Sequence, residues 1–126
     1  MQTKHITSFS REISLSVFDS ETLVTAQTGK DAILIPENLS GMVLTAVVVG
    51  CAQINTGTVS VQIRKGYNGV DMLQTQVTLT NQLWIDDGAV NPVNRQVQKG
   101  NQLYVNVSVS GQSPKGLFVA LTFKHY

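Results

Sequence analysis

The sequence predicts an all-β fold, an antiparallel β-sandwich of jelly-roll type with about eight strands and an extended N-terminal arm. Two runs near the C-terminus, 103–109 and 117–123, carry an apolar residue at every second position and are joined by a link that contains glycine and proline. A period of two places every second side chain on one face of a strand. Turn residues divide the rest of the chain into short runs without helical periodicity, which favours a sandwich or a barrel.

The first half of the chain contains four candidate strands, which are Ile13 to Val17, Ile33 to Ile35, Val43 to Val49 and Val59 to Ile63. Pro36 and a turn over residues 39–42 separate the second run from the third. The third run is rich in β-branched residues, which predicts a central strand buried on both faces. After the fourth run, Tyr67-Asn68-Gly69 predicts a tight connection.

The second half of the chain begins with two short runs, 77–79 and 83–85, that are apolar or alternate in polarity. Residues 86–88 have the composition of a turn, and Asn91-Pro92 predicts a longer loop because proline cannot donate to a strand ladder. The two C-terminal runs then complete a count of about eight strands, which is what a two-sheet jelly roll requires.

The domain organisation is simple, because 126 residues suffice for one hydrophobic core. The first dozen residues are polar and precede the first alternation, so we expect an arm over residues 1–12 and a single β-sandwich domain over residues 13–126. The one candidate for helical structure is a short turn near residues 19–27, where Asp19 or Ser20 would cap the first turn.

Charge is sparse in this chain. Nine basic and eight acidic residues make up 13% of the sequence, about half the usual share, and leave a net charge of +1. Copies with so little charge repel one another weakly, which favours a homo-oligomer. The basic residues are scattered and no segment reaches the roughly 20 apolar residues of a membrane span, so we expect neither nucleic acid nor membrane as a partner. The N-terminus also lacks the apolar region of a secretory signal.

No group of residues in the sequence has the pattern of a catalytic, cofactor-binding or metal-ligating site, so we expect a protein without enzymatic activity, cofactor or metal. Cys51 stands alone within the apolar segment 46–52, and His5 and His125 lie at the two ends of the chain. A nucleophilic cysteine needs a nearby base, so this one is expected to be a buried thiol.

The segment 84–87 holds the candidate glycan contacts. Asp86 and Asp87 would point to opposite faces if they lay on a strand, and Gly88 after them favours a turn instead. Trp84 is explained by a place in the core or in an interface, but it would also serve as a stacking platform for a sugar ring. We take Tyr67, Trp84, Asp86 and Asp87 as the contacts of such a site.

Several turns and strand starts follow one another in a recognisable order: Leu34-Ile35-Pro36 with Gly41 and Leu44, Gly57-Thr58-Val59 with Gln62 and Ile63, Asp71-Met72-Leu73, and Lys115-Gly116-Leu117 with Val119. Over residues 15–123 this order resembles the small jelly-roll β-sandwich structural proteins of tailed-bacteriophage virions. The matching residues are turns and strand starts, so the resemblance implies a fold and a virion context and identifies no catalytic position.

The resemblance implies a capsid decoration or cement protein that binds the major capsid protein and stabilises the head. Such a protein is located in the virion, after assembly in the bacterial host cytoplasm. A trimer on a local three-fold axis is a natural geometry for it. An arm that orders on a neighbour would bury Ile6 and Phe9, and we take these residues with Arg11 as assembly contacts.

An alternative remains open at this point. Relatives of the same type serve as tail, fibre or baseplate modules, and one of these would present its loops to a host-surface glycan. The two hypotheses differ in what the chain binds. Decoration predicts broad contacts with a capsid, whereas receptor binding predicts contacts centred on the loops near Trp84.

Overall fold

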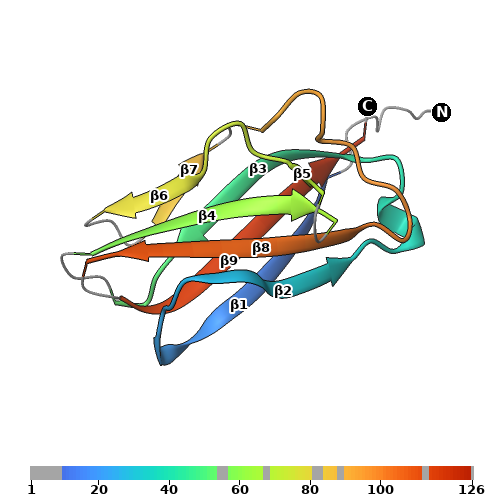
Figure 1. The fold of residues 1–126 in the computed structure, drawn as a ribbon. Coiled ribbons are helices and arrows are strands. Elements are labelled where there is room, and N and C mark those ends of the chain that lie inside the picture. The colour runs from blue at the N-terminus through green and yellow to red at the C-terminus, as the bar shows by residue number, and fades with distance from the viewer. Residues whose placement is uncertain are drawn as a thin grey trace.

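The computed structural model describes residues 10–53, 57–66, 69–80, 84–87, 90–111 and 114–125, which form two antiparallel sheets packed face to face (Figure 1). Sheet A has the strand order β1-β9-β3-β7, and sheet B has the order β2-β8-β4-β5 with β6 also paired to β4. The elements are β1 (Ser10–Leu23), β2 (Gln27–Leu34), the 3-10 turn η1 (Glu37–Leu39), β3 (Val43–Gly50), β4 (Thr58–Lys65), β5 (Val70–Asp71), β6 (Val77–Thr80), β7 (Trp84–Asp87), β8 (Gln102–Ser110) and β9 (Lys115–Lys124).

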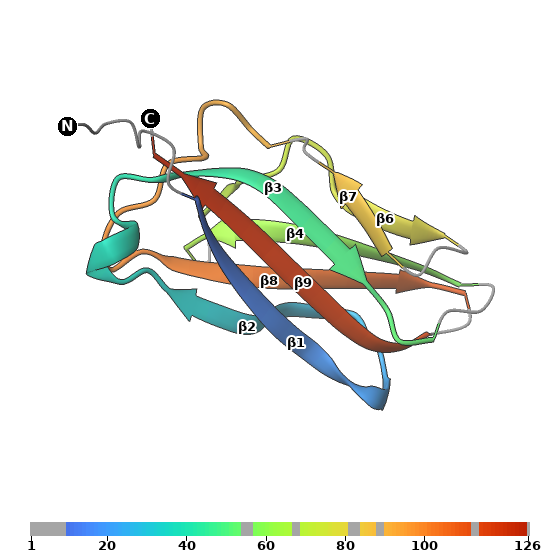
Figure 2. The ribbon, with the colours of Figure 1, turned by 180° about the vertical axis from the view of Figure 1, so that it is seen from behind.

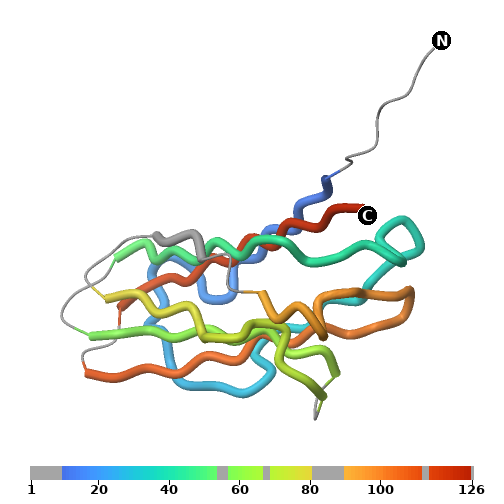
Figure 3. Tube along the Cα trace, turned by 90° about the horizontal axis from the view of Figure 1, so that it is seen from above, coloured from blue at the N-terminus to red at the C-terminus, as the bar shows by residue number. Residues whose placement is uncertain are grey.

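The path of the chain is that of a jelly roll. It passes from sheet A to sheet B and back at almost every connection, and only β4, β5 and β6 follow one another within a sheet. The two layers are seen edge-on in Figure 3. The predicted antiparallel jelly-roll β-sandwich is therefore confirmed, and the described residues contain nine strands because the region 70–80 forms two short strands, β5 and β6.

Alternation in the sequence becomes alternation between core and surface. The strand residues that face the other sheet are fully or almost fully buried, among them Val59, Val61, Ile63, Leu103, Val105, Leu117, Val119, Leu121 and Phe123. These side chains come from both C-terminal strands and from β4, so both sheets contribute to one core. This burial is the main favourable contribution to folding.

The beginning of the first strand differs from the sequence-based expectation. Ser10 is the register partner of Lys124, so residues 10–12 belong to β1 although the sequence assigned them to the arm. Residues 1–9 lie outside the described part of the chain. The expected helical turn at residues 19–27 is wrong, because β1 continues to Leu23, opposite Lys115, and the Val24 N–H donates to the Pro114 carbonyl at 2.9 Å. Pairing with the C-terminal segment outweighs the local capping signal there.

The third strand is internal to its sheet, as expected, but it is not buried on both faces. Val47 and Val49 are fully buried in the core, whereas Ala46 and Val48 are only half-buried on the outer face of sheet A. Figure 2 shows this sheet from its outer side, with β1, β9, β3 and β7 in front. The β-branched run of β3 therefore leaves part of its apolar side-chain surface on the outer face of sheet A, outside the core of the single chain.

One buried polar side chain ties sheet B to the connection that follows β5. The Gln62 Oε1 accepts hydrogen bonds from the N–H groups of Ile63 and Leu73, both at 3.1 Å, and its Nε2 donates to the Leu73 carbonyl at 3.3 Å. The side chain thus takes the place of a strand neighbour for the backbone of Leu73. A buried amide is tolerated here because its donor and acceptor both have partners.

We predict that Gln62→Leu lowers the free energy of unfolding by about 1–3 kcal/mol, because it leaves the buried N–H and C=O of Leu73 without partners. Urea denaturation monitored by circular dichroism measures the change. Ser60→Ala is the matched control, because the Ser60 hydroxyl hydrogen-bonds Thr78 at 2.9 Å in an exposed position on the same strand. Its effect should stay within about 0.5 kcal/mol. Equal losses in the two variants would contradict the structural role of Gln62.

Close approach of three segments requires glycine at the start of β9. Gly116 has a φ of +72°, and a Cβ at this position would lie 2.9 Å from the Ser20 Cα and 2.9 Å from the Ala52 Cβ. A residue with a side chain is strained in the left-handed region and would also displace β1 or the segment that follows β3.

We predict that Gly116→Ala destabilises the protein by about 2–5 kcal/mol, the sum of backbone strain and overpacking. Gly100→Ala separates the two effects, since Gly100 has a φ of +89° and a Cβ added there would meet no neighbouring atom within 4 Å. Gly100→Ala should lower the free energy of unfolding by the backbone strain alone, about 1–2 kcal/mol. Thermal unfolding of both variants tests the difference, and an equal loss would show that the close contacts at Gly116 carry no cost.

Candidate functional site

The residues predicted as assembly contacts are only partly within the described structure. Ile6 and Phe9 lie outside it. Arg11 is exposed on β1, where its register partner is Phe123 on β9. Arg11 therefore stands at the beginning of sheet A, directly after the segment that contains the other two residues.

Three of the four predicted glycan contacts lie within the described structure. Tyr67 lies outside the described residues. Trp84, Asp86 and Asp87 belong to β7 of sheet A, and the expected turn at Asp86 and Asp87 is wrong. The register places Asp86 opposite Val48 and Asp87 opposite Val47, because pairing with β3 outweighs the local turn signal. Consecutive strand positions belong to opposite faces, so the backbone does not present the two aspartates as a pair.

A metal site requires several side chains that could together bind the ion. Within it, no cluster of three or more His, Cys, Asp or Glu side chains could hold a metal ion. The same residues contain no helix long and apolar enough to cross a membrane.

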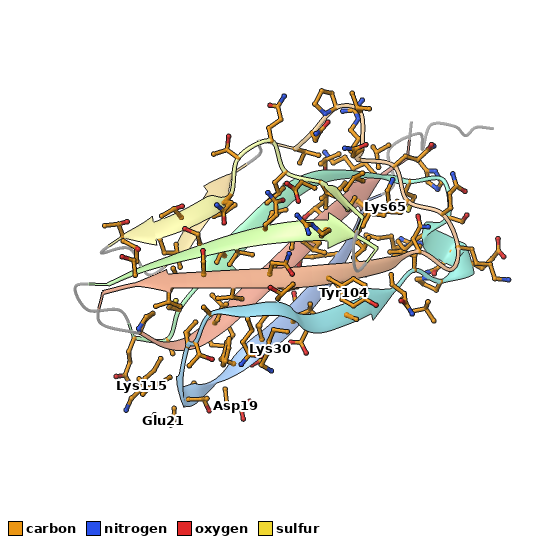
Figure 4. All side chains as sticks on the ribbon, viewed as in Figure 1. Asp19, Glu21, Lys30, Lys65, Tyr104 and Lys115 are labelled. Carbon is orange, nitrogen blue, oxygen red and sulfur yellow. The ribbon has the colours of Figure 1, made fainter. Side chains whose placement is uncertain are left out.

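A polar hollow of about 510 Å³ lies at the corner where β1 leads into β2. Its lining includes Phe18, Asp19, Lys30 and Asp31, and Figure 4 shows Asp19 and Lys30 at this corner. The Lys30 ammonium nitrogen stands 5.0 Å from the centre of the Phe18 ring, and Phe18 is only 6% exposed. The cation–π contact covers the aromatic face, so the corner offers no open platform for a sugar ring.

A second hollow, of about 600 Å³, opens on the outer face of sheet A. Its lining has no charged side chain, and its outward-facing members come from three adjacent strands: Ser14 and Ser16 of β1, Phe118 and Ala120 of β9, and Val48 and Gly50 of β3. We call these six residues the apolar face. Phe118 is 41% exposed at the edge of a floor of small residues. A contiguous apolar surface of this kind usually marks an interaction site.

The register explains why these residues meet. Ser14, Ala120 and Val48 are partners across the three strands, and Ser16, Phe118 and Gly50 form the next row. Trp84 extends the second row as the partner of Gly50 on β7. Sequence reasoning missed this surface because its members are scattered over the chain. The signal that could have indicated it is the apolar run of β3, because its outward positions Ala46 and Val48 are apolar as well as its inward ones.

The outer face of sheet B is of the opposite character. Its outward positions on β4, β6 and β8 carry hydroxyl and amide groups, namely Thr58, Ser60, Thr78, Thr80, Asn106, Ser108 and Ser110. The Asn106 Oδ1 accepts a hydrogen bond from the Gly29 N–H at 2.7 Å. Tyr104 and Lys65, also on this sheet, are visible in Figure 4. Sheet B is thus suited to water, whereas sheet A carries the apolar face.

Comparison with protein-family models and with curated proteins finds no match to the sequence. Among solved structures, the chain is similar to VP2 of infectious bursal disease virus in its subviral particle, with a TM-score of 0.53 and 14% identity over 93% of this chain and 33% of that chain. A structure of the Gx strain of this virus gives a TM-score of 0.52 at 14% identity, over 92% of this chain and 32% of that chain.

The chain therefore spans about a third of the length of these viral proteins. At this level of identity the similarity concerns the fold, and it agrees with the jelly-roll strand order described above.

Cys51 lies beside the apolar face and lines the same hollow. Its residue is 5% exposed, and burial raises the pKa of the thiol from 9.0 to about 11. The thiolate is the reactive form, so burial protects this cysteine from alkylation and oxidation near neutral pH. Because the folded state holds the proton more tightly than the unfolded state, the thiol favours folding below pH 9 and this contribution is lost as the pH rises towards 11.

We predict that a thiol reagent at pH 8 labels native Cys51 about 100-fold more slowly than the unfolded chain, because the thiolate fraction falls by about this factor when burial raises the pKa from 9.0 to about 11. The rate is measured by absorbance with and without urea. A small thiol of similar pKa, free in solution, serves as the control for reagent reactivity in urea. Equal rates in the native and unfolded protein would contradict the burial of the thiol.

Proposed function

We propose that this chain is a non-enzymatic structural protein of a bacteriophage virion, a capsid decoration protein that binds the major capsid protein and stabilises the head. The observation that carries the proposal is the jelly-roll strand order, which agrees with the sequence resemblance to small virion proteins and with the fold similarity to a viral particle protein. Fold alone does not determine function, so the sparse charge and the apolar face are needed as additional support.

Decoration acts by mass action. A protein that binds the assembled head and not the separated subunits stabilises the head by its binding free energy. The proposal places the major capsid protein and further copies of this chain as partners, with a trimer on a local three-fold axis as the favoured geometry. The proposal keeps residues 1–12 as the segment that contacts a neighbour and residues 13–126 as the rest of the domain, with residues 10–12 also forming the start of β1. The contacts with the neighbour are Ile6, Phe9 and Arg11.

Arg11 lies within β1, so its backbone belongs to sheet A, while its side chain is exposed. It follows Phe9 by two positions in the sequence. A capsid surface with a carboxylate near this position would accept a charge-assisted hydrogen bond from the guanidinium. The apolar side chains of Ile6 and Phe9 would supply the burial that offsets the ordering of the arm.

We predict that the purified protein co-sediments with phage heads that lack it, at a fixed ratio to the major capsid protein. A double variant, Ile6→Ser with Phe9→Ser, should bind at least about 10-fold more weakly, because two apolar anchors of about 1.5–3 kcal/mol each are lost. Thr25→Ser with Thr28→Ser is the control, since both positions are exposed and lie outside the arm.

Binding to host cells and not to heads would contradict decoration. That result would favour the glycan-binding alternative, with Trp84, Asp86 and Asp87 as the first positions to substitute. Undiminished head binding by the double variant would exclude the arm as the contact and leave the decoration role itself in place.

A further inference from the structure

The apolar face combines a projection and a recess on one surface. Phe118 stands out from the sheet, and beside it the side chains of Ser14, Ala120 and Gly50 are small or absent, which leaves the open hollow of about 600 Å³. A partner that fills the recess needs an uncharged, apolar projection, because no charged side chain lines it. Phe118 of another copy is such a projection. A surface that carries both parts is complementary to itself.

The composition of β3 supports a covered face. Its apolar run has the pattern of a strand buried on both sides, yet Ala46 and Val48 are half-buried in the single chain. Strands with one face in water normally carry polar residues on that face, and β4 and β8 of sheet B follow this rule. The outward positions of β3 are apolar, which is the pattern of a strand face that a further layer of protein covers.

The size of sheet A is sufficient for a specific contact. Strands β1, β9, β3 and β7 have 14, 10, 8 and 4 residues, a mean of 9. Four strands of this mean length, spaced about 4.8 Å apart with about 3.3 Å per residue, present a face of about 570 Å² in projection. Two such faces contribute about 1,100 Å², just above the lower limit of about 1,000 Å² for a specific protein interface. A net charge of +1 per copy opposes this association only weakly.

We propose that the outer face of sheet A is the contact between two copies of this chain, with Phe118 of each copy packed against the apolar face of its neighbour. This contact closes between two copies, so it is separate from the three-fold contact of the proposed trimer, and it leaves the hydroxyl-rich face of sheet B exposed. The inference goes beyond the virion role and does not depend on it, because it concerns the purified chain alone.

Sedimentation velocity of the full chain over a range of concentrations tests the proposal. The wild type is expected to sediment as an oligomer. Ser14→Arg places a long charged side chain in the recess from an exposed position, and it should raise the dissociation constant at least about 100-fold, because a charge buried at an interface lacks a partner there. Phe118→Ala removes the projection without adding a charge and should raise the constant at least about 10-fold.

Ser108→Arg is the matched control, because it makes the same substitution at an exposed position on the outer face of sheet B. It should leave the oligomer unchanged. Circular dichroism and urea unfolding establish that each variant is folded.

Three results would overturn the proposal. The first is a wild-type chain that stays monomeric at every concentration. This result overturns the proposal even if the monomer binds phage heads through Phe118. The second is an oligomer that Ser14→Arg and Phe118→Ala leave intact while both variants are folded. The third is an equal effect of Ser14→Arg and Ser108→Arg.

Discussion

Both sheets depend on the two C-terminal strands. In sheet A, β9 lies between β1 and β3, and in sheet B, β8 lies between β2 and β4. Without its C-terminal member each sheet would lose an edge strand, because β1 would separate from β3 and β7 in sheet A and β2 would separate from β4 in sheet B. The pairing of Ser10 with Lys124 brings the beginning of the described chain next to its end. Most of the contacts that define the fold are therefore distant in sequence, and loop closure precedes most of the hydrogen bonding.

This arrangement explains which parts of the fold the sequence could predict. The C-terminal strands have the clearest alternation in the chain, since each is paired on both sides and buries one complete face. Strand existence and fold class follow from such local patterns. The turn expected at Asp86 and the helical turn expected after Asp19 were wrong, because in both places a distant strand offered the backbone better hydrogen-bonding partners than the local sequence did.

The candidate surface was harder to predict than the strands. Ser14, Val48 and Phe118 are far apart in the sequence and become neighbours only through the register of three strands. A shift by one residue would turn each of them towards the core. Serine, glycine and alanine also occur at many kinds of position, so their presence in a sequence does not indicate a recess. The recess forms here because these small residues leave space that larger side chains would fill. A large aromatic residue such as Trp84 can be proposed as a binding residue from the sequence, whereas the small residues that form the floor of a recess cannot.

The contrast between the two outer faces determines how the domain can be oriented in an assembly. Burying the face of sheet B would remove water from a ladder of hydroxyl and amide groups, and each group left without a partner would cost about 1–3 kcal/mol. Some are already engaged with one another, as Ser60 is with Thr78, but these bonds lie in the exposed ladder and do not require a dry environment. The apolar face has no such groups to desolvate except two serine hydroxyls, which can bond to water at the rim. The lower cost of burial therefore lies with sheet A, and an assembly of this chain would turn sheet A towards its protein neighbours and sheet B towards solvent.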